Sequence, residues 1–242
     1  MLYFDHAATT PIHPDVAEKM DHISRQGFGN PSSIYSSGRS SKSIIENARI
    51  QTANMIEAHP SEIFFTGSGT ESNNIVLWSL LHQKKKHVIT SSIEHPAVLK
   101  VLDELRVFGL TYDVLSVDST GLIDPTNLKS AIKKDTGLIS IMYVNNEVGT
   151  VQKIEELVEI AHDQRIPFHS DCVQSIGKMS VSCKRLGVDY MSFSAHKFYG
   201  PKGIGFLYKK EGLPIKPLVI GGGQESNVRA GTENLSGIAG LG

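Results

Sequence analysis

The chain has 242 residues, a formal net charge of −1 at pH 7 and 40% hydrophobic residues, an ordinary composition for a globular protein. The near-zero charge offers no basic surface for nucleic acid, and no apolar run approaches the roughly 20 residues that a membrane span needs. The N-terminus lacks a secretory signal, and two cysteines make neither a disulfide framework nor a metal-type spacing. We therefore expect a reduced, cytoplasmic protein with no metal site and no direct contact to nucleic acid or membrane.

Helix and strand patterns alternate along most of the chain. Helices are predicted at 13–26, 40–57, 71–83, 96–108, 125–133 and 154–164, and strands at 62–66, 87–91, 111–117, 138–144, 167–170, 188–194 and 203–208. This alternation predicts an α/β fold of βαβ units, with a mostly parallel seven-stranded sheet sandwiched by helices. In such sheets the functional groups gather at the carboxyl ends of the strands.

A glycine-rich turn, Gly67-Ser68-Gly69-Thr70, follows the first predicted strand and opens a helix. Its backbone N–H groups and the helix N-terminus can hold an anion, and Thr70 can cap the helix and offer its hydroxyl to a phosphate. A simple turn between strand and helix is an equally good interpretation of this motif alone. The motif matches neither the dinucleotide-binding fingerprint nor a P-loop.

Ionisable side chains follow three further strands. Lys197 could bind an aldehyde cofactor such as pyridoxal 5′-phosphate (PLP) through its amine, or be a surface lysine. Asp171 could pair with a protonated ring nitrogen, or cap a helix. His95 could stack on a flat ring and move protons, or be structural. Each residue alone decides little, but their gathering at successive strand ends predicts one site.

Six motifs in order strengthen this prediction: TGSGTESNN (66–74), EHPAV (94–98), VNNEVGT (144–150), HSDCVQSIGK (169–178), SFSAHKFYGPKGIGFLY (192–208) and GGGQESNVRAGTEN (221–234). The chain resembles the cysteine desulfurases of the class V aminotransferase group, which have the PLP-dependent fold type I. The opening YFDHAATTP (3–11) and GNPSS (29–33) fit as well, so the resemblance covers essentially all 242 residues.

The resemblance implies roles for individual residues. Lys197 would form the Schiff base with PLP, Asp171 would pair with the pyridine nitrogen, and His95 would stack on the ring and assist proton transfer. Two amides would contact the ring oxygen side, namely Asn146 and Gln174. The phosphate would be held by Gly69, Thr70, Ser194 and His196 and, across a homodimer, by Thr232. Asn30 is a candidate for binding the substrate.

The implied activity is removal of sulfur from L-cysteine, which gives L-alanine and an enzyme persulfide. The sulfur would pass to an acceptor protein, a scaffold for iron–sulfur clusters or a tRNA thiolase. Two alternatives stay open: a related class V enzyme such as a selenocysteine lyase or an aminotransferase, and a non-catalytic module that uses the same fold to bind partners.

The sequence ends at Gly242, whereas members of the resembled family are longer. Residues 16–242 are expected to form the PLP-binding large domain and residues 1–15 a segment that packs on a small domain. That C-terminal small domain and the loop with the catalytic cysteine are absent, so we expect a fragment or one half of a split protein, inactive alone and poorly soluble or tightly associated. Cys172 and Cys183 are not expected to replace the missing nucleophile.

Overall fold

Seven strands form one sheet in the computed structural model, which describes residues 2–242. The order across the sheet is β1-β7-β6-β5-β4-β2-β3, and only β7 runs antiparallel to its neighbours. The strands are β1 (Ile63–Thr66), β2 (His87–Ser91), β3 (Thr111–Leu115), β4 (Thr136–Ser140), β5 (Phe168–Asp171), β6 (Tyr190–Ser194) and β7 (Gly205–Lys209). The predicted mostly parallel seven-stranded sheet is confirmed.

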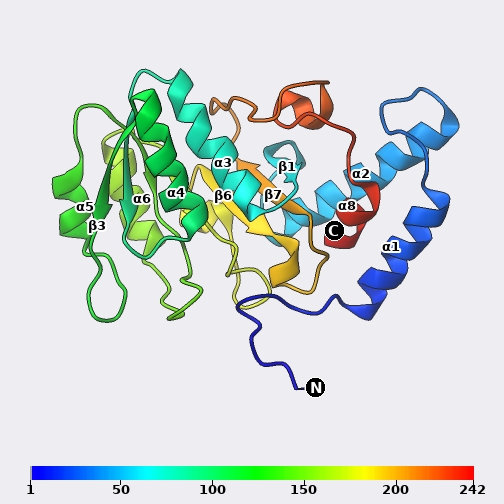
Figure 1. Cartoon of the computed structure of the whole chain (residues 1–242), viewed down its shortest axis with the longest axis horizontal. Helices are drawn as coiled ribbons and strands as arrows, with labels where there is room; N and C mark the ends of the chain where they lie inside the picture. Colours follow the sequence, from blue (N-terminus) through cyan, green and yellow to red (C-terminus); the bar gives the residue numbers. More distant parts are fainter. Residues whose placement is uncertain (1) are drawn as a thin grey trace.

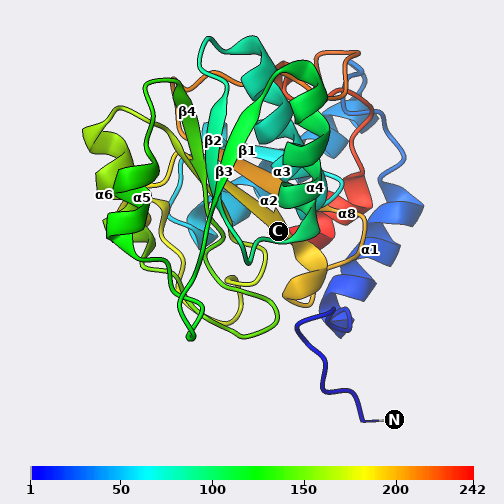
Figure 2. The ribbon, with the colours of Figure 1, turned by 60° about the vertical axis from the view of Figure 1, so that its left-hand side comes forward.

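Helices cover both faces of this sheet (Figures 1 and 2). They are α1 (Pro14–Gln26), α2 (Ser36–Met55), α3 (Gly69–Ser79), α4 (Pro96–Leu105), α5 (Pro125–Ala131), α6 (Ile154–Asp163), α7 (Cys183–Leu186) and α8 (Leu235–Leu241). One apolar cluster joins α3 and α4 to one face, and the other joins α2, α5, α6 and α7 to the opposite face. Nearly every strand residue of β1, β2, β5, β6 and β7 is buried, as a two-sided cover requires.

Several predicted boundaries differ from the structure. Helix α2 begins at Ser36 rather than near residue 40, because the loop before it packs on its first turn and leaves no room for a side chain at Gly38. Strand β4 ends at Ser140 rather than at 144, although the Ile141 and Tyr143 amides still donate to carbonyls of β5.

No helix within residues 2–242 is both long and apolar enough to cross a bilayer.

The N-terminal segment lies against the residues that follow β6. The Thr10 amide and hydroxyl both donate to the His196 carbonyl, at 2.8 and 2.9 Å, and the His13 amide donates to the Tyr199 carbonyl at 2.9 Å. The Tyr199 amide in turn donates to the Thr10 hydroxyl at 2.7 Å. These bonds hold residues 7 and 8 beside the carboxyl end of β6.

One ion pair anchors the segment between β7 and α8. Glu225 lies between β7 and α8 and receives two hydrogen bonds from the Arg49 guanidinium, at 2.8 and 2.9 Å. Its carboxylate also accepts from the Phe65 amide of β1 at 2.8 Å. Glu225, Ser226 and Asn227 all have positive φ, between 45° and 65°, a strained conformation for residues with a side chain. The ion pair therefore fixes a turn that would not form by local preference.

A buried histidine links three central strands. His169 of β5 places Nδ1 2.8 Å from the Ser140 hydroxyl of β4 and Nε2 3.0 Å from the Ser192 hydroxyl of β6. The imidazole is fully buried, and burial lowers its pKa from 6.5 to about 3. His169 therefore stays neutral in the folded chain at pH values where it gains a proton in the unfolded chain.

We predict that this histidine makes the fold sensitive to acid. A depressed histidine pKa contributes stability that is complete above pH 6.5 and is lost as the pH falls toward 3. The loss is about 1.4 kcal/mol for each pH unit below 6.5. Urea unfolding between pH 4 and 8 checks this in wild type and His169→Gln, with His22→Asn on the exposed face of α1 as control. An equal acid response in wild type and His169→Gln would contradict the assignment.

Candidate active site

A cavity of about 340 Å³ opens at the carboxyl ends of the parallel strands. Nine of the residues predicted to hold a cofactor line it: Gly69, Thr70, His95, Asn146, Asp171, Gln174, Ser194, His196 and Lys197. They come from five separate strand exits, so the sheet brings them together as expected for a βαβ fold. The volume lies within the range of small-ligand sites.

The anion-binding turn is built around Ser68 and Gly69. Helix α3 begins at Gly69, and the Ser68 hydroxyl caps it by accepting from the Glu71 amide at 3.1 Å. The prediction that Thr70 caps the helix is therefore wrong: Thr70 lies inside the first turn, because the helix starts two residues earlier than predicted. A Cβ added at Gly69 would lie 2.5 Å from Val173 Cγ2, so glycine is needed at this position. The first-turn N–H groups of a helix have no acceptor within it and can bind an anion.

Asp171 is held from two sides at the end of β5. Its carboxylate accepts from the Asn73 amide nitrogen at 2.7 Å and from the Val173 backbone amide at 3.0 Å. No helix begins at Asp171, so a helix-capping role is excluded. Burial raises the pKa of this carboxyl, and the hydrogen bonds from Asn73 and Val173 only partly oppose the effect. A cationic ring nitrogen beside it would favour its charged form.

Lys197 presents its amine at the end of the short turn that follows β6. The amine donates to the backbone carbonyls of Ala7 and Ala8, at 2.6 and 2.7 Å. Burial lowers its pKa, against the attraction of the Asp171, Asp5 and Glu147 carboxylates. A lowered pKa increases the unprotonated fraction, the form that attacks an aldehyde. The structure thus places the Lys197 amine in the cavity, where its two backbone partners fix its position.

His95 and His196 flank the cavity with different partners. His95 caps α4, because its Nδ1 accepts from the Ala97 amide at 3.1 Å, so the residue also has a structural task. His196 Nδ1 lies 3.0 Å from the Thr9 hydroxyl. Burial, with the nearby Lys197 and Lys202 charges, lowers the pKa of His196. A neutral His196 can donate a single ring N–H toward a bound anion.

The two predicted amides are both engaged. Gln174 donates to the Ala7 carbonyl at 2.8 Å and accepts from the Lys178 amine at 2.5 Å, while Asn146 donates to the Glu147 carboxylate at 2.5 Å. Lys178 was not predicted to lie here, and burial and the Lys197 charge lower its pKa. Gln174 thus connects the N-terminal segment to a second amine beside the cavity.

Two predicted residues lie elsewhere. Thr232 is exposed on the segment after β7 and does not line this cavity, which leaves its role across a dimer a prediction. Asn30 lies in the loop between α1 and α2, where its side chain accepts from the Ser32 amide at 2.9 Å. The structure does not bring Asn30 to the cavity, and its role in binding substrate also stays a prediction.

Sequence reasoning missed residues that act through long-range contacts. Asn73 is the clearest case: it is buried on α3 and donates to Asp171, yet it follows Gly69 by only four positions. Because residues four apart share a helix face, that spacing was an available signal. The Ala7 and Ala8 carbonyls carried no such signal, since any residue provides a backbone carbonyl.

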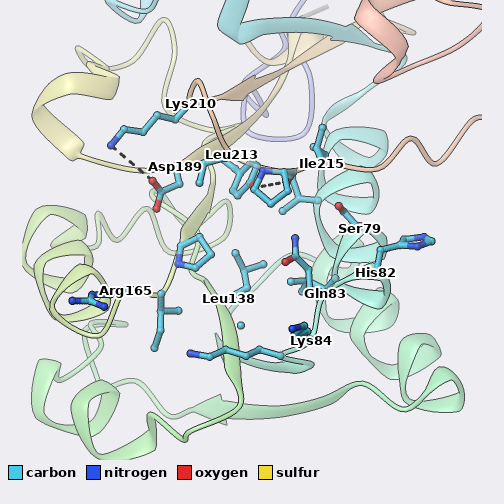
Figure 3. A pocket seen from close by; sticks show the side chains of 18 of the residues that line it. Ser79, His82, Gln83, Lys84, Leu138, Arg165, Asp189, Lys210, Leu213 and Ile215 are labelled. Carbon is cyan, nitrogen blue, oxygen red and sulfur yellow. Dashed lines mark hydrogen bonds and ion pairs between the residues drawn. The ribbon is translucent and has the colours of Figure 1, made fainter.

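A larger hollow of about 760 Å³ lies at the opposite edge, where the parallel strands begin. Basic and apolar side chains surround it (Figure 3), among them Lys84, Arg165, Lys210, Leu138, Leu213 and Ile215. Its one buried carboxylate, Asp189, is satisfied by the Phe168 amide and by His162, at 2.8 Å each. None of the described residues that line this hollow has a buried polar atom without a hydrogen-bond partner. The gathering of the predicted residues places the candidate chemistry at the other edge.

Both cysteines are buried, and burial raises the pKa of each thiol. Cys172 is fully inaccessible between Asp171 and the turn at Val173, and Cys183 opens the short helix α7. A sulfur nucleophile has to be an accessible thiolate. Neither thiol is suited to accept sulfur from a substrate, as predicted.

Comparison with known proteins identifies the family of this chain. The family model described as Aminotransferase class-V matches residues 2–242, and the chain belongs to that family. A protein named Cysteine desulfurase IscS, from Dictyoglomus turgidum, is 50% identical over 244 residues, which are 100% of this chain and 62% of the relative. A solved NifS-like protein superposes with a TM-score of 0.97 at 42% identity, covering 99% of this chain and 67% of the other.

A second solved structure, SspA in complex with cysteine, has a TM-score of 0.96 at 40% identity and covers 100% of this chain and 71% of that one. The chain thus spans about three fifths of the curated relative that it matches. These likenesses confirm the fold type predicted from the six motifs.

The residues present fit PLP, the cofactor on which this family depends. The cavity combines an amine of lowered pKa, a buried carboxylate and a glycine at a helix N-terminus, which suit the aldehyde, the ring nitrogen and the phosphate respectively. The Asn73 side-chain oxygen is buried and has no hydrogen-bond partner within residues 2–242. A polar group in that state is costly unless a ligand or water completes it.

Proposed function

We propose that this chain forms the cofactor-binding part of a PLP-dependent cysteine desulfurase. The single observation that supports this most strongly is the joint placement of Lys197 and Asp171 in one cavity with the α3 N-terminus. The identity of 50% to a cysteine desulfurase and the likeness to a structure holding cysteine support the reaction class. Bound PLP would supply a conjugated ring that takes up negative charge from the substrate.

Each side chain has a distinct task in this proposal. Lys197 would hold the cofactor through its aldehyde group and would hold or move a proton at its amine during the reaction. Asp171, oriented by Asn73, keeps the ring nitrogen protonated. His95 would contact the ring and assist proton transfer, and Asn146 and Gln174 would contact its oxygen side. Thr70, Ser194 and His196 hold the phosphate together with the Gly69 amide.

The substrate in this proposal is L-cysteine, and the products are L-alanine and a persulfide on a cysteine outside residues 1–242. The sulfur then passes to an acceptor protein that serves iron–sulfur cluster assembly or tRNA thiolation. Thr232 reaches the phosphate of a second copy in a homodimer, and the protein acts in the cytoplasm. A related reaction on selenocysteine or an amino-group transfer would use the same lysine and carboxylate.

PLP titration of the purified chain tests the cofactor assignment. We expect a visible absorbance band that saturates at one PLP per chain, and a change of this band when L-cysteine is added. L-Serine, which has the same backbone without sulfur, is the control ligand. No saturable band would refute the cofactor assignment, and an equal response to serine would contradict the preference for cysteine. Alanine and sulfide released from L-cysteine would distinguish a desulfurase from a non-catalytic module.

A further inference from the structure

Glu94 is a buried carboxyl next to the proposed site that has no task in the reaction outlined above. It directly precedes His95 in the loop between β2 and α4 and is only 6% exposed. Ion-pair geometry within residues 2–242 gives it no lysine, arginine or histidine partner. A carboxyl without a charged partner is costly to bury, so its place requires an explanation.

One oxygen of Glu94 joins two strand exits. Oε1 accepts from the Ser91 hydroxyl at the end of β2, at 2.5 Å, and from the Met142 amide beyond β4, at 2.9 Å. A second hydrogen bond joins the same two loops: the Asn145 side-chain nitrogen donates to the Ile93 carbonyl at 2.9 Å. The two loops that meet here carry the ring-facing residues of the proposed site.

We propose that Glu94 is a positioning residue, which holds the His95 loop against the loop that carries Asn146 and so sets both side chains against the cofactor. This inference rests on the proposed function, since it assigns the means by which two of its residues are placed. Glu94 acts through its neighbours: His95 follows it directly, and Asn146 follows Asn145, whose side chain oxygen accepts from the Glu147 and Val148 amides at 2.9 Å each.

The other oxygen, Oε2, is buried and has no hydrogen-bond partner in the described part of the chain. A carboxylate in that position would leave a charge unsatisfied, so the neutral acid is favoured. Burial raises the pKa of Glu94 to about 8, and the nearby Asp171 carboxylate adds to the effect, against the bonds from Ser91 and Met142. A neutral Glu94 adds no negative charge beside Asp171, the carboxyl that the proposed function pairs with the ring nitrogen.

The neutral state has a signature in stability. A carboxyl whose folded pKa lies above its unfolded value of 4.5 loses stabilising effect as the pH rises from 4.5 to about 8, where the loss is complete. Glu94→Gln removes only the Glu94 proton-binding site and keeps the other ionisable groups near the site, Asp171, His95 and Lys197, in the sequence. The difference in melting temperature between Glu94→Gln and wild type therefore isolates the Glu94 proton.

Three variants test the proposal in the 242-residue chain. Glu94→Gln keeps an acceptor oxygen for Ser91 and Met142, Glu94→Ala removes it, and Glu104→Gln on the exposed side of α4 is the matched control. Without cofactor, we expect Glu94→Ala alone to shift the ¹⁵N amide resonances of Ala97 and Met142. We also expect the melting temperature of Glu94→Gln, relative to that of wild type, to increase as the pH rises to about 8. Above that pH the difference between the two melting temperatures should be constant.

With PLP added, Glu94→Ala should weaken binding about tenfold, the factor that matches loss of one buried hydrogen bond, and should reduce the circular dichroism of the bound cofactor. Glu94→Gln should have the PLP affinity of wild type and the same circular dichroism of the bound cofactor. Unshifted Ala97 and Met142 resonances in Glu94→Ala, or unchanged cofactor dichroism, would overturn the positioning role. If wild type itself binds no PLP, the proposed function fails, whereas the amide resonances still decide whether Glu94 holds the two loops together.

Discussion

Replacement of Lys197 by alanine should abolish the visible absorbance band that PLP forms with this chain. The expected loss is complete, because the described cavity holds no other lysine: Lys178 lies beside it, where its amine donates to Gln174, and Lys202 is exposed. The Lys197 amine is held against the N-terminal segment by the Ala7 and Ala8 carbonyls. Burial lowers its pKa, so a larger fraction of this amine is unprotonated near neutral pH than of an exposed lysine.

Borohydride reduction followed by peptide mass mapping measures the attachment directly. We expect the pyridoxyl mass on the peptide that contains Lys197 in wild type, in Lys178→Ala and in Lys202→Ala, and on no peptide in Lys197→Ala. Attachment should also increase with pH, because the unprotonated fraction of the Lys197 amine grows as the pH rises toward its lowered pKa. A reduced adduct on Lys178 or Lys202, or a band that persists in Lys197→Ala, would disprove the assignment of the amine.

Replacement of Glu225 by alanine should destabilise the fold by about 3–5 kcal/mol, the cost of breaking a buried ion pair from one side. The side chain is only 3% exposed, and its loss leaves the Arg49 guanidinium and the Phe65 amide without this acceptor. It also removes the contact that holds three consecutive positive-φ residues in place. The segment that carries Arg229 and Thr232 should then become mobile, with faster amide hydrogen exchange.

Glu46→Ala provides the matched control, because Glu46 contacts the same guanidinium from the solvent side at 3.3 Å and is 48% exposed. Its expected effect is below about 1 kcal/mol, since exposed pairs contribute little. Urea unfolding of the two variants measures both values. Similar losses for Glu225→Ala and Glu46→Ala would show that burial does not determine the strength of this pair.

The site residues were predicted from one feature of the amino-acid sequence. Polar side chains follow the apolar strand patterns at successive exits, and parallel strands deliver such residues to one edge. Asp171 ends β5, and Lys197 ends the short turn that follows β6, both at the edge of the sheet that the pattern indicated. The N-cap at Ser68 was missed because both Ser68 and Thr70 are good capping residues, and local preference does not choose between them.

The sequence by itself determined the strand–helix alternation, the residues at each strand exit and the family, because these depend on short-range periodicity and on motif order. Only the tertiary structure decided which side chains act on one another. Asn73 reaches Asp171 across 98 positions, and Arg49 reaches Glu225 across 176. The same holds for the raised pKa of Glu94, whose main cause is burial away from water. Burial and long-range pairing are properties of the packed chain: local spacing could place Asn73 on a helix face, but it could not identify Asp171 as its partner.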